Sequence, residues 1–166
     1  MTQRTPADGQ VSLREITGES VRDVCKLEVA PDQRELVAPN ALSIAQAYFE
    51  PAAWFRAVYA GERPVGFAML YDPTQTREPE GGPDTCYLWR FMIDQREQRK
   101  GYGTAALALL IAHVRKLPGV RRFRTSFVPS AGNASPLYER AGFRETGEID
   151  DGETVMELPI APRASA

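Results

Sequence analysis

The sequence predicts a single α/β (α+β) domain with a mixed, mostly antiparallel sheet of about seven strands and helices on both faces. A chain of 166 residues suits one hydrophobic core. Segments with strand-like patterns outnumber helical ones, and only two helices separate strands in the second half, too few for a fully parallel sheet. We expect the domain to cover residues 11–160, between disordered tails at 1–10 and 161–166.

The first part of the chain predicts one strand and two helices. Apolar and polar residues alternate over Val11–Ile16, as in a half-buried strand. We expect a helix over Gly18–Ala30, because Thr17 offers a hydroxyl cap and Pro31 ends it. A second helix is expected over residues 40–50, before the next proline.

The middle of the chain predicts a hairpin, a strand and the main helix. Two β-rich runs, Trp54–Ala60 and Val65–Asp72, flank the turn GERP. A polar loop over residues 73–84 precedes Thr85–Asp94, a strand dense in aromatic and β-branched residues. After a glycine-containing turn, an Ala/Leu-rich helix extends to about Lys116.

The last part predicts a strand over Val120–Val128, a short helix closed by Gly142, and a final hairpin. One right-handed crossover would then make the strands at 85–94 and 121–128 parallel neighbours.

Composition excludes several classes of partner. The formal net charge of −2 gives no general attraction to nucleic acid or to an anionic membrane. No run approaches the roughly 18 apolar residues of a membrane helix, and the first residues do not resemble a signal peptide. Cys25 and Cys86 show no metal spacing with each other or with His113. We therefore expect a cytoplasmic protein with reduced thiols and no metal, and assign His113 no role.

The turn QRKGYGT at residues 98–104 has the features of a phosphate site. A helix N-terminus exposes unpaired N–H groups and a partial positive charge. Gly101 and Gly103 remove the Cβ atoms that would keep an anion from those amides, and Arg99 and Lys100 add positive charge. The alternative is a tight turn with solvated basic residues.

The same glycines fit the G-x-G-x-x-A pattern of dinucleotide-binding folds. That interpretation fails because the first glycine lies seven residues beyond the predicted strand end at Asp94. In addition, no carboxylate follows the strand at 120–128, where the ribose-binding acid would stand.

Two motifs together resemble the GCN5-related N-acetyltransferase (GNAT) family: QRKGYG at residues 98–103 and NASPLYERAGF at residues 133–143. The expected order of strands and helices matches the GNAT fold over residues 11–160. Three segments look similar to bacterial diamine and polyamine (spermidine/spermine) N-acetyltransferases: residues 30–51, 87–94 and 147–160.

The resemblance implies acetyl-CoA as co-substrate. Its diphosphate would bind the turn formed by Gln98, Arg99, Lys100, Gly101, Tyr102, Gly103 and Thr104. Backbone groups of Met92 and Ile93 would meet the pantetheine and the acetyl carbonyl, in a V-shaped gap between the parallel strands. Asn133 would hydrogen-bond to the pantetheine or to the neighbouring chain.

Amine acylation also needs a proton donor and a proton acceptor. A phenol can protonate the departing thiolate, and we expect Tyr138 to do so, although a purely structural aromatic is the alternative. Glu28 would share the apolar face of the first helix with Val24, so it is either an edge residue or the base. Asp94 and Glu97 are alternative bases.

The sequence thus predicts acetyl transfer to a primary amine of a small molecule, with a diamine or polyamine as candidate. Glu28, Asp32, Glu35 and Glu50 could meet its nitrogens, whereas Arg90 would repel a cation if it pointed into the cleft. A protein or peptide N-acetyltransferase and a non-catalytic acyl-CoA sensor are the alternatives. A homodimer is expected from the family resemblance alone.

Overall fold

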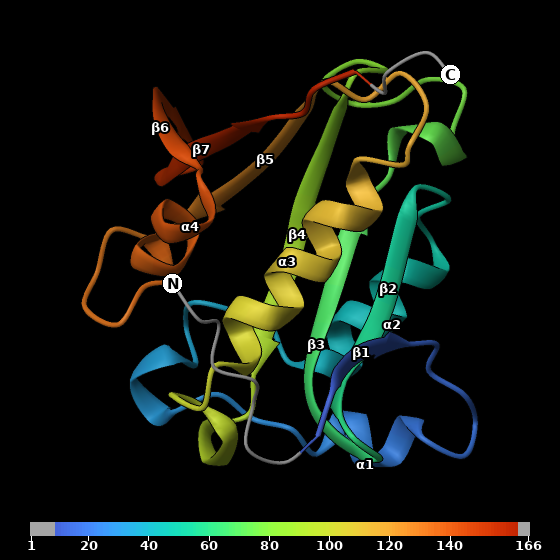
Figure 1. Ribbon diagram of the computed structural model, residues 1–166, viewed down its shortest axis with the longest axis vertical. Helices are drawn as coiled ribbons and strands as arrows, with labels where there is room; N and C mark the ends of the chain where they lie inside the picture. Colours follow the sequence, from blue (N-terminus) through green and yellow to red (C-terminus); the bar gives the residue numbers. More distant parts are fainter. Residues whose placement is uncertain (1–8, 163–166) are drawn as a thin grey trace.

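The computed structural model describes residues 9–162, so residues 1–8 and 163–166 of the expected tails lie outside the described residues. One seven-stranded sheet has the order β1-β2-β3-β4-β5-β7-β6, as Figure 1 shows. The strands are β1 (Val11–Arg14), β2 (Ala53–Ala60), β3 (Arg63–Tyr71), β4 (Thr85–Ile93), β5 (Arg122–Phe127), β6 (Arg144–Asp150) and β7 (Glu153–Pro159). The expected fold class is confirmed: neighbouring strands are antiparallel except for the parallel pair β4–β5.

Helices cover both faces of the sheet (Figure 1). They are α1 (Val21–Cys25), α2 (Asn40–Tyr48), α3 (Tyr102–Val114) and α4 (Ser135–Ala141), with 3-10 turns η1 (Pro31–Gln33), η2 (Pro73–Gln75) and η3 (Gln95–Glu97). On the α3/α4 face, Leu107 and Leu110 pack with Phe123 and Phe143. On the α1/α2 face, Val24 packs in a second cluster with Phe67, Met69 and Met92. No helix within residues 9–162 is long and apolar enough to cross a membrane.

The helix expected over Gly18–Ala30 is wrong in its length, because α1 ends at Cys25. The reason lies in the hydrogen bonds of Glu28. Its N–H donates to Asp94 Oδ2 at 3.0 Å, and its carbonyl accepts from the Gln95 N–H at 2.7 Å. Tertiary partners at the end of β4 thus take the backbone groups that a longer helix would use.

The central feature of the sheet is the short contact between β4 and β5. Their pairing covers three positions: Thr85↔Arg122, Cys86↔Phe123 and Tyr87↔Arg124. Beyond Tyr87, β4 remains paired with β3 as far as Ile93, but β5 does not follow it. A register shift between Met69 and Leu70 leaves Trp89 as the extra residue of a bulge, which adds local twist to β4.

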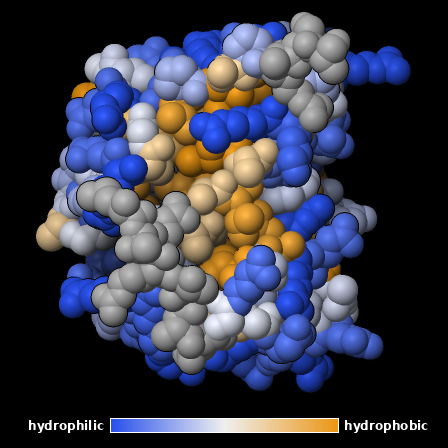
Figure 2. Space-filling view, viewed as in Figure 1, coloured by the Kyte–Doolittle hydropathy of each residue, from blue (hydrophilic) through white to orange (hydrophobic). Residues whose placement is uncertain are grey.

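Helix α3 is apolar on its outer side as well as on its buried side. Leu107 and Leu110 are buried, while Ala108, Leu109 and Ala112 are exposed. Figure 2 shows the resulting apolar area on the face that α3 occupies. This explains why the helix reads as a continuous Ala/Leu run in the sequence instead of an amphipathic pattern.

Gly66 of β3 offers a direct test of how closely β3 and β4 approach. A Cβ at this position would lie 2.5 Å from the Met92 carbonyl oxygen, which cannot move without disturbing the sheet. We expect Gly66→Ala to lower the free energy of unfolding by about 2 kcal/mol or more in urea denaturation. Gly18→Ala is the matched control, since no atom lies within 4 Å of its Cβ position. Equal unfolding free energies for the two variants would contradict the strand pairing.

Candidate active site

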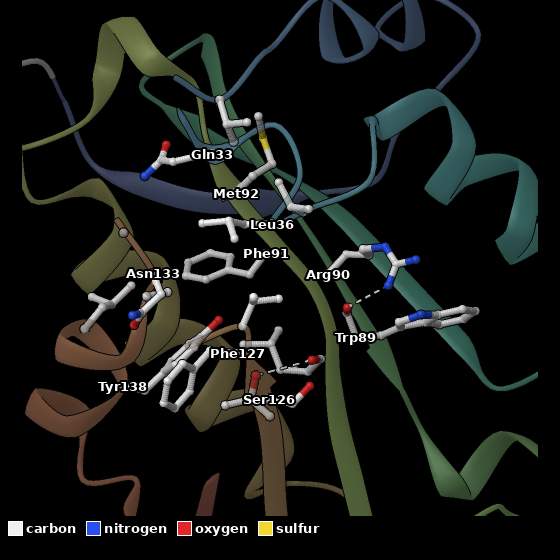
Figure 3. Close-up of a pocket in the computed structure, with 18 of the residues that line it drawn as sticks. Gln33, Leu36, Trp89, Arg90, Phe91, Met92, Ser126, Phe127, Asn133 and Tyr138 are labelled. Carbon is white, nitrogen blue, oxygen red and sulfur yellow. Dashed lines mark hydrogen bonds between the residues drawn. The ribbon is translucent and has the colours of Figure 1, made fainter. Parts of the chain in front are cut away.

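A cleft of about 1510 Å³ opens where β4 and β5 diverge. The second half of β4, the end of β5, the start of α3, the loop before α4 and the segment after η1 all line it. Figure 3 shows Phe91 and Met92 of β4, Phe127 of β5 and Tyr138 of α4 around this space. One wall of the cleft is therefore a strand edge that no other strand covers.

The glycine turn forms one corner of the cleft. Arg99 has a φ of 64° and Gly101 a φ of 90°, so the turn twice enters the left-handed region. Alternation of this kind turns successive N–H groups toward one point, where an anion can bind. Gly101 is the N-cap of α3, and the first N–H groups of that helix have no intrahelical partner. A Cβ at Gly101 would meet no atom within 4 Å, so the space above the turn is open.

The side chains of the turn have different surroundings. Gln98 donates from Nε2 to the Ile93 carbonyl at 3.0 Å and to Gln33 Oε1 at 2.8 Å, which ties β4 to η1. Arg99, Gly101, Gly103 and Thr104 line the cleft alongside Gln98. Lys100 instead pairs with Glu97 at 3.0 Å, and Tyr102 is buried in the core with 1% exposure. Neither Lys100 nor Tyr102 lines the cleft.

The exposed edge of β4 presents the backbone of Phe91 and Ile93. The Asp94 N–H donates to the Val65 carbonyl at 2.8 Å, and the Met92 carbonyl lies against Gly66, so both residues face β3. Backbone groups alternate sides along an antiparallel strand, which turns the odd-numbered residues toward the gap. The backbone groups of Ile93 and Phe91 therefore face the gap, whereas those of Met92 face β3, although Met92 also lines the cleft. The pairing register of β4 with β3, which the sequence alone does not reveal, decides which backbone groups face the gap.

Tyr138 combines a structural ring with a hydroxyl at the cleft. It is buried on α4, and its ring lies 5.7 Å from the Phe143 ring. Thr125 of β5 acts against burial on the pKa of this hydroxyl, and the Thr125 hydroxyl donates to the Leu88 carbonyl at 3.5 Å. Burial raises the pKa of Tyr138 to about 12, so the phenol keeps its proton at neutral pH. A protonated phenol beside the gap can act as a proton donor.

Asn133 lines the cleft but its amide is already bonded within the loop before α4. Its Oδ1 accepts from the Ser135 N–H at 2.9 Å, and its Nδ2 donates to the Ser130 carbonyl at 2.6 Å. The neighbouring Gly132 carbonyl accepts from Gln33 Nε2 at 3.4 Å. Asn133 thus shapes the wall of the cleft through the backbone of this loop.

Glu28 does not line the cleft. Its side chain is 62% exposed and lies 3.9 Å from Arg34, in the irregular segment after α1. The face that it was expected to share with Val24 does not exist, because the helix has already ended. Of the other acids suggested for the acceptor, Glu35 and Glu50 line the cleft and Asp32 does not.

The alternative bases are held as ions by their neighbours. Burial would raise the pKa of Asp94, but hydrogen bonds from Arg96 and from the Glu28 backbone outweigh it and lower that pKa. For Glu97, Arg63 and Lys100 likewise outweigh burial and lower the pKa. A carboxylate stabilised in this way is a weak proton acceptor.

The opposite side of the cleft contains residues that the sequence analysis did not single out. Glu153 begins β7 and accepts a hydrogen bond from the Ser126 hydroxyl of β5. The dipeptide Asp151-Gly152, with φ values of 46° and 80°, forms the turn that positions Glu153. A two-residue Asp-Gly loop is typical of a tight hairpin, so this part of the arrangement could have been found from sequence.

Arg90 also lines the cleft, next to Trp89 (Figure 3). Its guanidinium donates to the Trp89 carbonyl at 3.1 Å and to Gln46 Oε1 of α2 at 3.2 Å. Burial lowers the pKa of Arg90, and the charge of Glu153 acts in the opposite direction. The positive charge is thus held toward α2 and faces a carboxylate across the cleft.

The burial of Tyr138 predicts a specific loss of stability in alkali. Because its folded pKa is raised from about 10 to about 12, its contribution is complete below pH 10 and is lost as pH rises toward 12. Between these values, the unfolding free energy of the wild type should fall by about 2–3 kcal/mol more than that of Tyr138→Phe. Burial also raises the pKa of Cys86, but this effect is common to both proteins and cancels. Parallel stability curves in urea between pH 9 and 12 would contradict the assignment.

The chain is similar to known proteins over most of its length. The sequence profile of the acetyltransferase (GNAT) family matches residues 12–143. The chain is also 30% identical over 151 residues to the spermine/spermidine N(1)-acetyltransferase of Bacillus subtilis (strain 168). That match covers 88% of this chain and 96% of the relative.

Solved structures share the fold. Aminoglycoside acetyltransferase AAC(6')-Ib in complex with coenzyme A has a TM-score of 0.72 at 21% identity, covering 90% of this chain and 95% of that one. The ribosomal-protein-S18-alanine N-acetyltransferase from Escherichia coli has a TM-score of 0.66 at 20% identity, covering 94% and 97%. At these identities the likeness concerns the fold alone. The profile match over most of the chain nevertheless decides the family: this protein is an acetyltransferase of the GNAT family.

Proposed function

We propose that this protein transfers the acetyl group of acetyl-CoA directly to a primary amine of a small molecule, with polyamines as the first candidates. The observation that carries the proposal is the open edge of β4, which joins the glycine turn to the Tyr138 hydroxyl along one cleft. This combination provides a place for the diphosphate, for the extended pantetheine arm and for a proton donor.

The carrier would bind mainly through main-chain groups. Its diphosphate meets the N–H groups of the turn and of the first residues of α3, where the helix dipole favours an anion. The pantetheine amides pair with the backbone of Phe91 and Ile93 as an added strand would. A strand-edge N–H then stabilises the oxyanion that forms during attack, an effect worth about 3–4 kcal/mol for one donor in other enzymes.

The reaction proceeds by direct attack. The neutral amine forms a bond to the carbonyl carbon, and the carbonyl electron pair moves to oxygen. When that pair returns, the C–S bond breaks and the thiolate takes the Tyr138 proton. The phenolate recovers a proton from the new ammonium nitrogen, so the products are the amide and the free thiol. Alignment of the two reactants contributes about 7–11 kcal/mol in favourable cases.

The charges around the acceptor side support a cationic substrate. Carboxylates of Glu50, Glu80, Asp150 and Glu153 line this part of the cleft. Arg90 would repel a cationic substrate if its side chain pointed into the cleft. Its guanidinium instead donates hydrogen bonds to Gln46 and to a main-chain carbonyl. The spermine/spermidine specificity named for the curated relative supports the same class of acceptor.

Two expectations about the whole protein remain predictions. A cytoplasmic location fits the free thiols of Cys25 and Cys86, which form no disulfide. A homodimer rests on the family resemblance alone.

Release of the CoA thiol across a panel of acceptors tests the proposal. The panel contains spermidine, spermine, kanamycin, lysine and a short peptide with a free N-terminus. We expect turnover with small alkylamines and the highest kcat/KM with a polyamine. Turnover confined to the peptide would indicate a peptide N-acetyltransferase. Tight binding of acetyl-CoA in calorimetry without any turnover would indicate a sensor.

A substitution at Gly103 can distinguish an effect on phosphate binding from an effect on the stability of the fold. A Cβ here would lie 3.6 Å from Leu137 and 3.7 Å from Ile93, which are ordinary contacts, and the residue is helical. Gly103→Ala should therefore keep or raise the unfolding free energy, by up to about 1 kcal/mol. It should weaken acetyl-CoA binding at least tenfold, because the methyl group approaches the diphosphate.

S-acetylpantetheine, which lacks the diphosphate, is the control substrate for this variant. Its turnover should be the same in the wild type and in Gly103→Ala. Unchanged affinity of the variant for acetyl-CoA in calorimetry would refute the phosphate assignment.

A further inference from the structure

Glu153 differs from the exposed carboxylates of the cleft in its burial, and from Glu97 in its lack of an ion pair among the described residues. Six carboxylates line the cleft: Glu35, Glu50, Glu80, Glu97, Asp150 and Glu153. Glu35, Glu80 and Asp150 are exposed, and Glu97 is neutralised by Arg63 and Lys100. Glu153 is half-buried, and no ion pair of the described residues involves it. Within the described part of the chain, its carboxylate thus lies in the cleft with no cation in direct contact.

The fold fixes the position of Glu153. It pairs with Asp150 across the Asp151-Gly152 turn, at the end of the β6–β7 hairpin. The Ser126 hydroxyl donates to its carboxylate from β5, at the point where β5 has left β4. A neutral donor orients a carboxylate without removing its charge.

Charged and titratable groups surround this carboxylate from each neighbouring element. Tyr138 lies on the α4 side, Arg90 on the β4 side and Asp150 on the β6 side, while Ser126 of β5 is uncharged. The negative charge of Glu153 acts with burial to raise the pKa of Tyr138. It is therefore close enough to interact with both the proposed proton donor and the cation on the opposite wall. Glu50, by contrast, accepts from the Ala52 N–H at 2.9 Å, beyond the end of α2.

We propose that Glu153, oriented by Ser126, receives the acceptor as an ammonium ion and takes its proton before attack. The inference rests on the function proposed above and assigns the base to a residue that lines the cleft, which Glu28 does not. The N–H bond of the ammonium breaks, its electron pair stays on nitrogen, and the proton moves to a Glu153 oxygen. The neutral amine then attacks, and Glu153 releases the proton to solvent after product formation.

This role defines the class of acceptor. An alkylamine with a pKa of about 10 arrives protonated at neutral pH and needs a carboxylate both to bind and to be deprotonated. A weakly basic aromatic amine is already neutral and gains nothing from Glu153. The cleft is thus suited to alkylammonium groups.

The test compares Glu153→Gln and Ser126→Ala with the wild type over pH 6 to 10, using the amine of highest kcat/KM from the panel above. Glu145→Gln is the matched control, since Glu145 is exposed on β6 and lies outside the cleft. Glu153→Gln should lower kcat/KM about 10²-fold or more at pH 7. The loss should narrow as pH rises toward the pKa of the amine, because more acceptor then arrives neutral. Ser126→Ala should lower kcat/KM by a smaller factor and should shift the acidic limb of the pH profile of kcat/KM.

The Kd for acetyl-CoA, measured by calorimetry, should stay within twofold of the wild-type value in all three variants. This result would show that the fold of each variant is intact. A Glu153→Gln rate within threefold of the wild type at pH 7 would overturn the inference and leave the proposed function standing. If Glu153→Gln lowered kcat/KM by the same factor at every pH, proton transfer to Glu153 would be refuted, and the proposed function would again remain. Absence of turnover by the wild type with every amine would instead overturn the proposed function, and this inference with it.

Discussion

The separation of β4 from β5 is the constraint on which the rest of the site depends. The two strands pair at only three positions, and beyond Tyr87 one edge of β4 has no neighbouring strand. Unpaired N–H and C=O groups of a strand edge need another partner, and an extended arm with amide groups supplies one. The glycine turn, Tyr138 and Glu153 all lie around this opening, which makes one break in the sheet the origin of the whole cleft.

A second set of contacts holds the free end of β4 in place. Asp94 accepts from the Glu28 N–H, and Gln98 bridges the Ile93 carbonyl and Gln33. Gln33 in turn donates to the Gly132 carbonyl in the loop before α4. The segment after α1 is therefore tied by hydrogen bonds to both sides of the opening. The early end of α1 follows from the same contacts, because the backbone groups of Glu28 form hydrogen bonds with Asp94 and Gln95 after β4 and not within a helix.

Local signals allowed the sequence to predict most of the fold. The strand patterns, the hairpin around residues 61–64 and the helix after Gly101 depend on neighbours in the chain, and the structure agrees with them. Contacts between distant segments explain the differences. The end of α1 depends on the bond between Glu28 and Asp94, which lie 66 residues apart, and the register with β3 decides which backbone groups of β4 face the gap. Glu153 was missed for the same reason, because Ser126 and β4 approach it only in the folded chain.

A crystal structure of the protein with bound coenzyme A would show whether the carrier lies along the open edge of β4. We expect the diphosphate to contact the main-chain N–H groups of residues 99–104. We also expect the pantetheine amides to pair with Phe91 and Ile93, and the sulfur to lie within hydrogen-bonding distance of the Tyr138 hydroxyl. Coenzyme A bound elsewhere, with the edge of β4 still open and the glycine turn empty, would refute this binding mode.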